Sequence, residues 1–262
     1  MKNNYHIDSE GEELINRAKA FTLQAGKEGV LLVHGFSGTI DTLRPLGNYL
    51  FSQGYTVHGV RLAGHGENVD ALAETNVNDW LESVRQGIIE LKKICDDITI
   101  VGDSMGGNLA LKICLENKEI NKLILLGTPI QVHGQWWKQI FIPLITPFKK
   151  YYNKSWVKND DQRREHVESG SYLKVSLKAF ISAMKLFNQT KKVVPQVTLP
   201  VLMIYSKKDE VIKPDSADYI FKNLGSKNKK LFWITDSVHH PQDSAKREQI
   251  YSKIYHFLKS NI

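Results

Sequence analysis

Cysteine is scarce in this chain of 262 residues, which contains only Cys95 and Cys114. Two cysteines are too few for a disulfide framework, and neither stands in the spacing of a metal-binding motif. Both fall among apolar residues of predicted helices, where a cysteine is usually a small buried hydrophobe. A disulfide-stabilised scaffold is therefore excluded, and the cysteine content fits a reducing cytoplasm.

Long hydrophobic runs are also absent. No stretch reaches the roughly 18 apolar residues that a transmembrane helix needs. The first residues, Met1 to Asp8, lack the apolar core of a secretory signal peptide. We therefore expect a cytoplasmic protein with no stable membrane insertion.

The excess of positive charge has no nucleic-acid signature. The formal net charge is +7, but the lysines are scattered as pairs along the chain and no nucleic-acid-binding motif accompanies them. Such pairs are typical of a solvated surface, so we expect no nucleic-acid partner. The sequence leaves the oligomeric state open, a homodimer included.

What the sequence does contain is a regular alternation of predicted strands and helices. With 42% hydrophobic residues, the chain can bury a sizeable core. The alternation favours an α/β fold in which a mostly parallel sheet is flanked by helices. The predicted strands cover 18–24, 29–33, 56–60, 98–101, 122–126, 201–205 and 230–234. The predicted helices cover 43–53, 77–94, 108–112, 216–224 and 245–258. Residues 1–262 are predicted to form a single domain.

The alternation breaks over residues 130–192. This segment has no short apolar strand and instead contains aromatic and helical stretches. Because the alternation resumes afterwards, we interpret 130–192 as a helical cap inserted into the domain; an ordinary run of packing helices is the alternative. Its aromatic residues are candidates to line an apolar pocket, and packing of the cap onto the core is the alternative for each. These candidates are Trp136, Trp137, Phe141, Phe148 and Phe187.

One motif carries specific chemistry, the Gly-x-Ser-x-Gly sequence at 102–106. An apolar strand over 98–101 precedes it and helix-forming residues follow it. In this context a serine stands on a tight strand-to-helix turn and acts as a nucleophile. The flanking glycines remove side chains that would crowd the turn. We therefore predict Ser104 as the nucleophile and the N–H of Met105, at the helix start, as an oxyanion donor.

A serine nucleophile needs a base, and the base needs a carboxylate that holds its tautomer. In this fold the chain order is serine, acid, histidine, with the last two on loops after later strands. Asp209 follows the predicted strand 201–205, and His239 follows the predicted strand 230–234. The order of Ser104, Asp209 and His239 therefore matches a catalytic triad.

Neighbouring residues compete for two of these roles. Glu210 would point away from the site if the backbone stays extended, and Asp215 stands near a helix start, where capping is the ordinary role. His240 competes for the role of base, but adjacent residues cannot both face the serine. Pro241 restricts His240 to extended geometry. The loop position therefore favours His239.

A second oxyanion donor is expected from the loop after an early strand. Residues 34–38, His-Gly-Phe-Ser-Gly, directly follow the second predicted strand. The N–H of Phe36 is therefore predicted to act together with that of Met105. His34 lies on the wrong loop for the base and is expected to brace this loop, and His65 is expected to be a hydrogen-bonding brace. Neither histidine has a metal-ligand partner at a useful spacing.

These motifs fall in one order along the chain: His34-Gly35-Phe36-Ser37-Gly38, Arg61-Leu62-Ala63-Gly64-His65-Gly66, Asn78-Asp79-Trp80, Gly102-Asp103-Ser104-Met105-Gly106-Gly107, Asp209 and Ser237-Val238-His239. From about Ala20 onward, the chain resembles the small bacterial carboxylesterases and monoacylglycerol lipases of the α/β-hydrolase superfamily. The resemblance implies a serine esterase without cofactor or metal, with a small mobile cap over the acyl pocket. The chain departs from its relatives at Asp103, where His or Leu is frequent, and at Val238, which replaces the glycine before the base.

We therefore expect hydrolysis of short- to medium-chain acyl esters, monoacylglycerols among the candidates, through an acyl-enzyme. Other acyl chemistry on the same triad is the alternative, because fold and triad do not set the substrate. It includes thioesterase, acyltransferase, amidase and C–C hydrolase activity. A non-catalytic binding protein on the same scaffold is the alternative from another class. Haloalkane dehalogenases and epoxide hydrolases are disfavoured, since they place an aspartate where Ser104 stands.

Overall fold

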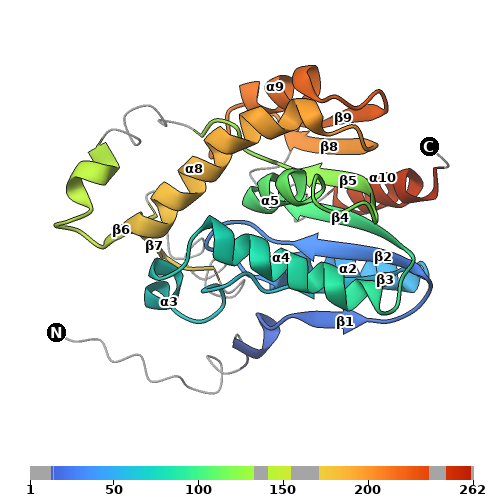
Figure 1. The fold of residues 1–262 in the computed structure, drawn as a ribbon, viewed down its shortest axis with the longest axis horizontal. Helices are drawn as coiled ribbons and strands as arrows, with labels where there is room; N and C mark the ends of the chain where they lie inside the picture. Colours follow the sequence, from blue (N-terminus) through green and yellow to red (C-terminus); the bar gives the residue numbers. More distant parts are fainter. Residues whose placement is uncertain (1–12, 14, 133–140, 155–170, 236–245, 261–262) are drawn as a thin grey trace.

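The computed structural model describes residues 13, 15–132, 141–154, 171–235 and 246–260. At its centre is a seven-stranded sheet in the order β1-β3-β2-β4-β5-β8-β9 (Figure 1). The strands are β1 (Phe21–Leu23), β2 (Glu28–Val33), β3 (Thr56–Val60), β4 (Asp97–Asp103), β5 (Ile120–Leu126), β8 (Val201–Ser206) and β9 (Lys229–Ile234). Only β1, at one edge, pairs antiparallel with its neighbour. The predicted mostly parallel sheet is confirmed.

Helices cover both faces of this sheet. The α-helices are α2 (Arg44–Ser52), α3 (Val69–Ala73), α4 (Val77–Lys92), α5 (Met105–Ile113), α8 (Leu177–Val193), α9 (Asp215–Asn223) and α10 (Arg247–Lys259). Short 3-10 helices form η1 (Ile40–Leu43) and η2 (Val194–Gln196). Within the described ranges, no helix combines the length and apolar character that crossing a bilayer requires.

The central strands bury both of their faces, which explains their continuous apolar sequence. In β2, Leu31 and Val33 belong to a core shared with α4, α5, α8 and α9. Val30 and Leu32 point the other way into a second core shared with α2 and α10. Figure 1 shows α4 and α5 in front of the sheet and α2 and α10 behind it. The sheet is therefore a rigid middle layer, and its carboxyl edge is a fixed platform for loops.

The segment 130–192 differs from its prediction in one respect. Residues 141–145 are helical and α8 is a long helix, but β6 (Tyr151–Asn153) pairs antiparallel with β7 (Lys174–Ser176). No short apolar strand was expected here, and β6 and β7 were not predicted, because these three-residue strands, Tyr-Tyr-Asn and Lys-Val-Ser, leave no apolar run. Side chains of α8 such as Ala183 and Leu186 join the core beside α5. The interpretation of the whole segment as an inserted cap stays a prediction, and below it is called the insert.

Two glycines let α5 approach the sheet closely. A Cβ atom added at Gly106 would lie 2.1 Å from the carbonyl oxygen of Val33, and one added at Gly102 would lie 2.5 Å from the Cα of Gly107. Real Cβ atoms do not approach this closely, and backbone of a central strand cannot move aside without breaking its ladder. The glycines therefore allow the helix to begin directly on β2 and β4.

We expect Gly106→Ala to lower the free energy of unfolding by about 1–3 kcal/mol, because the new methyl group overpacks the contact with Val33. Urea unfolding of the purified variant measures this change. Gly38→Ala is the matched control, since a Cβ there has its nearest neighbour at 3.7 Å. The control should stay within about 0.5 kcal/mol of the unmodified protein. Equal stabilities of the two variants would contradict the packing argument.

Candidate active site

Ser104 lies on the turn that joins β4 to α5, as the motif predicted. Its backbone adopts φ 51° and ψ −119°, and among the described residues only Ser37 is another non-glycine with positive φ. Such a conformation is strained for a serine and persists only where the surroundings impose it. The Ser104 N–H donates to the Leu126 carbonyl at 2.7 Å, and the Gly107 N–H donates to the Ser104 carbonyl at 3.0 Å. The structure thus places Ser104 half-buried on a sharp strand-to-helix turn.

The loop 34–38 lies directly against this serine. A Cβ atom added at Gly35 would be 3.1 Å from the Cβ of Ser104. Neither the N–H of Phe36, on this loop, nor the N–H of Met105, at the first turn of α5, donates a hydrogen bond to another residue that the structure describes. Two backbone donors on either side of Ser104 are therefore free of other described partners. This matches the expected arrangement, and their role as an oxyanion hole stays a prediction.

His34 orients one of these donors. Its Nδ1–H donates to the Gly35 carbonyl at 2.9 Å, and the Gly38 N–H reaches the same oxygen at 3.4 Å. The Gly35 carbonyl and the Phe36 N–H belong to one planar peptide unit and point in opposite directions. Fixing the carbonyl therefore fixes the direction of the N–H. His34 also accepts from the Leu62 N–H through Nε2 at 3.2 Å, so it braces the loop as expected.

The histidines near this loop are held neutral. Burial lowers the pKa of His34 to about 4, against the opposing effects of the hydrogen bond to Gly35 and the charge of Asp103. Burial also lowers the pKa of His65 to about 3, and the His65 Nδ1–H donates to the Ala63 carbonyl at 3.0 Å. At neutral pH both rings are therefore uncharged braces rather than proton carriers.

An aromatic cluster packs around the ring of Phe36. The ring centroids of Trp80, His65 and Phe180 lie 6.0, 6.2 and 6.2 Å from that of Phe36. Trp80 lies on α4. A capping box between Asn76 and Asp79 fixes the N-terminus of this helix. Phe180 comes from α8, and sequence reasoning did not identify it because nothing in its local pattern separates it from other packing residues.

Asp209 follows β8 and is buried, with 8% of its surface exposed. Its Oδ1 accepts the N–H groups of Val211 and Ile212, each at 2.8 Å, which fixes the carboxylate on its loop. The competing Glu210 and Asp215 are exposed, and Asp215 opens α9 at the solvent. Of the three candidate carboxylates, Asp209 is therefore the one withdrawn from water and held in place.

The sheet register gathers the loops that carry these residues. Asp103, Leu126, Ile204 and Phe232 are successive partners in one row across β4, β5, β8 and β9. Because these strands are parallel, the residues that follow them emerge at one edge. The predicted base His239, its competitor His240, and the pocket candidates Trp136 and Trp137 lie outside the described residues. The completed triad accordingly stays a prediction.

The other pocket candidates occupy different surroundings. Phe187, on α8, is buried in the core, as the packing alternative expects. Phe148 is 91% exposed and Phe141 53% exposed, both on the insert.

Asp103, the residue before the serine, is buried, and its Oδ2 would lie 3.7 Å from a Cβ at Gly35. The departure at Asp103 thus places a carboxylate directly behind the loop 34–38.

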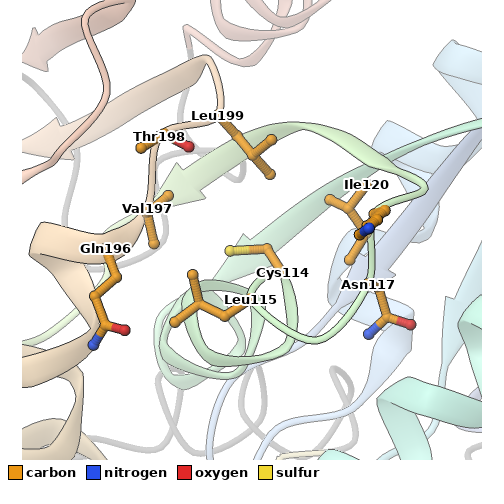
Figure 2. A pocket seen from close by; sticks show the side chains of 9 residues that line it. Cys114, Leu115, Asn117, Ile120, Gln196, Val197, Thr198 and Leu199 are labelled. Carbon is orange, nitrogen blue, oxygen red and sulfur yellow. The ribbon is translucent and has the colours of Figure 1, made fainter.

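The cavity in Figure 2, of about 330 Å³, lies away from this site. It is lined by the end of α5, the start of β5 and the segment before β8, including Cys114, Ile120 and Leu199. These are the amino ends of the strands, on the edge opposite Ser104. Among the residues that the structure describes, no group of three or more His, Cys, Asp or Glu side chains is placed to hold a metal ion.

Comparison with known proteins agrees with this geometry. A family model, Hydrolase_4, described as serine aminopeptidase, S33, matches residues 24–242. A thermostable monoacylglycerol lipase from Bacillus sp. (strain H-257) is 31% identical over 238 residues, covering 88% of this chain and 90% of that relative. A carboxylesterase from Bacillus subtilis (strain 168) is 26% identical over 242 residues, covering 92% and 96%. A solved structure from work on the metagenome-derived lipolytic enzymes LipS and LipT superposes with a TM-score of 0.84 at 23% identity, covering 92% and 97%, which supports the α/β-hydrolase fold.

The buried histidines predict how stability depends on pH. Because the folded-state pKa of His65 is lowered from 6.5 to about 3, the unfolded chain binds more protons than the folded one between these values. The free energy of unfolding should therefore fall as pH drops below about 6.5, by up to about 1.4 kcal/mol per pH unit for this group. In urea unfolding between pH 6.5 and 4.5, His65→Phe should reduce the pH dependence of the unfolding free energy by the equivalent of about one proton, relative to the unmodified protein. The same pH dependence in the variant and the unmodified protein would contradict a neutral, buried His65.

Proposed function

The chain belongs to the Hydrolase_4 family, and from that premise we propose that it is a serine carboxylic-ester hydrolase. The proposed substrates are short- to medium-chain acyl esters, monoacylglycerols among them. The observation that carries the proposal is Ser104 on a strained turn against the loop 34–38. The family description names a peptidase, but the relatives that span most of the chain are named as a monoacylglycerol lipase and a carboxylesterase, which favours esters.

In the proposed first step, His239 takes the proton of the Ser104 hydroxyl as its oxygen attacks the ester carbonyl. Asp209 holds the imidazole in the required tautomer and stabilises the imidazolium that forms. Its Oδ1 already accepts two backbone N–H groups, so Oδ2 is the oxygen that we assign to the histidine. The two backbone bonds keep the carboxylate from rotating away.

The tetrahedral intermediate carries a negative oxygen that needs preorganised donors. We assign this role to the N–H groups of Phe36 and Met105, the second of which benefits from the positive end of the α5 dipole. His239 then protonates the leaving alcohol, and an acyl group remains on Ser104. Water, deprotonated by the same histidine, attacks the acyl-enzyme. His239 then returns the proton to the Ser104 oxygen as the bond from this oxygen to the acyl carbon breaks, and the acid departs. No step of this scheme uses a cofactor.

The proposed setting is the cytoplasm, with a small-molecule ester as the partner. Both cysteines are free and buried, and burial raises the pKa of the Cys114 thiol to about 12. Neither thiol is therefore poised for oxidation or metal binding. Two free cysteines without a disulfide fit the proposed reducing compartment.

Ser104→Ala should abolish hydrolysis of p-nitrophenyl esters of graded acyl length, because the proposed acyl-enzyme forms on the Ser104 hydroxyl. We expect a loss of about 10⁶-fold in kcat, down to the background rate. Ser52→Ala, on the exposed end of α2, is the matched control and should retain full activity. A fluorophosphonate probe should label the unmodified protein once, at Ser104, as located by peptide mass spectrometry.

Two outcomes would contradict this assignment. Undiminished turnover in Ser104→Ala would remove Ser104 as the nucleophile. A folded protein that the probe does not label, and that hydrolyses none of the esters, would favour a binding protein on a hydrolase scaffold. Thioesters, amides and acyl acceptors other than water in the same panel separate ester hydrolysis from the other acyl chemistries that a triad supports.

Paired substitutions should separate the triad from its neighbours. Asp209→Asn should lower kcat by about 10⁴-fold, because the amide would present a donor to the imidazole and favour the wrong tautomer. Its control Glu210→Gln should stay within about twofold of the unmodified protein. His239→Gln should lose activity to a similar or greater extent, whereas His240→Gln should not. Steady-state kinetics on one p-nitrophenyl ester decides each pair, and loss in the second member of a pair would exchange the two assignments.

A further inference from the structure

One tyrosine of the insert makes three hydrogen bonds to loops beside the serine. The Tyr172 N–H donates to the Ser37 carbonyl at 3.0 Å. Its hydroxyl donates to the Gly64 carbonyl at 3.0 Å and accepts the Glu67 N–H at 2.9 Å. A single half-buried residue therefore joins the insert to the loop 34–38 and to the next loop along the chain.

The loop 34–38 needs such support at both ends. Ser37 has φ 57°, a left-handed conformation that costs free energy for a residue other than glycine. On one side, His34 holds the Gly35 carbonyl and accepts from the Leu62 N–H. On the other side, Tyr172 holds the Ser37 carbonyl. The Phe36 N–H lies between these two braces, and both braces reach the same neighbouring loop.

We propose that Tyr172 is a positioning residue that fixes the loop 34–38 from the insert and so aims the Phe36 N–H at the developing oxyanion. The inference rests on the function proposed above. The Phe36 N–H contributes most when negative charge develops on the substrate oxygen. A small error in its direction therefore reduces stabilisation of the transition state more than binding of the substrate. The insert thus contributes to the rate of reaction as well as to the substrate site.

The chemistry of the hydroxyl fits this role. It acts as donor and acceptor at once, and burial raises its pKa above the ordinary value, so it keeps the donated proton at neutral pH. A second tyrosine of the insert provides a contrast. The Tyr151 hydroxyl donates to Asp70 on α3, so it also attaches the insert to the domain, but at a place other than the loop of Gly64 and Glu67. The Tyr172 hydroxyl bonds that loop and acts on the loop 34–38 indirectly, by holding Tyr172 where its backbone N–H reaches the Ser37 carbonyl. Comparing the two separates positioning of the loop from attachment of the insert.

The test compares Tyr172→Phe with Tyr151→Phe, each of which removes one hydroxyl and keeps the ring. In Tyr172→Phe we expect kcat for a p-nitrophenyl ester to fall about tenfold with KM changed less than about twofold. A trifluoromethyl ketone with the same acyl chain, which forms a tetrahedral adduct at the serine, should bind weaker by the same factor as kcat/KM falls. Tyr151→Phe should stay within about twofold in all three quantities. The concentration of active sites is measured by titration with a fluorophosphonate, so that unfolded protein does not lower the apparent kcat.

The outcomes are distinguishable. If Tyr172→Phe matches Tyr151→Phe while ester hydrolysis persists, the inference is overturned and the proposed function stands. An equal fall of kcat in both variants also overturns it, because attachment of the insert alone would then explain the effect. If the unmodified protein neither hydrolyses esters nor reacts with the fluorophosphonate, the proposed function fails and the inference with it.

If Tyr172→Phe does not yield folded protein, 3-fluorotyrosine at position 172 replaces it. Its single fluorine lowers the phenol pKa but leaves it above neutral, and burial acts in the opposite direction. The hydroxyl therefore still donates to Gly64 at neutral pH and loses that proton at a lower alkaline pH than tyrosine does. We expect kcat to match the unmodified protein at neutral pH and to fall below it at alkaline pH, with KM unchanged. A pH profile identical to that of the unmodified protein would overturn the inference.

Discussion

The strained backbone of Ser104 depends on how closely α5 approaches the central strands. The helix begins within van der Waals contact of β2, because Gly106 has no side chain against the Val33 carbonyl. The Ser104 N–H is meanwhile tied to Leu126 on the next strand. With both sides fixed, the chain has no room to relax the turn, and the serine is held at φ 51°. The position of Ser104 at the carboxyl edge of the sheet is thus fixed by packing of the core and not by flexibility.

The same platform explains why the surrounding loops are held by neutral groups. Charged imidazoles could not be buried beside the loop 34–38 without a large desolvation cost, and burial accordingly lowers the pKa of both His34 and His65. A neutral ring still offers one donor and one acceptor, which is what His34 needs to join Gly35 to Leu62. The two histidines therefore hold the loops firmly without adding positive charge of their own at neutral pH.

The sequence predicts those parts of the structure that leave a hydrophobic pattern or a motif with fixed spacing in it. The apolar run of β2, the serine motif after β4 and the position of Asp209 after β8 follow from local patterns that the core requires. The pairing of β6 with β7 does not, since three-residue strands bury little and show no alternation. The contacts of Tyr172 likewise leave no pattern in the sequence, because Tyr172 stands 105 positions from Glu67 and 108 positions from Gly64 along the chain. Phe187 illustrates the remaining difficulty, since an aromatic residue on a helix has the same pattern in a core as in a pocket.

The insert divides into two parts with different constraints. Its carboxyl half is tied to the domain, through Tyr172 at the loops and through α8, where Thr190 accepts a hydrogen bond from the buried Asn108 of α5 at 3.1 Å. Its helical residues 141–145 carry large apolar side chains at the surface, Leu144 among them. A change in the first part would disturb the contacts with the loop 34–38 and with α5, whereas the exposed side chain of Leu144 takes part in neither. The geometry of the loop 34–38 is therefore tied to the carboxyl half of the insert and not to this exposed apolar surface.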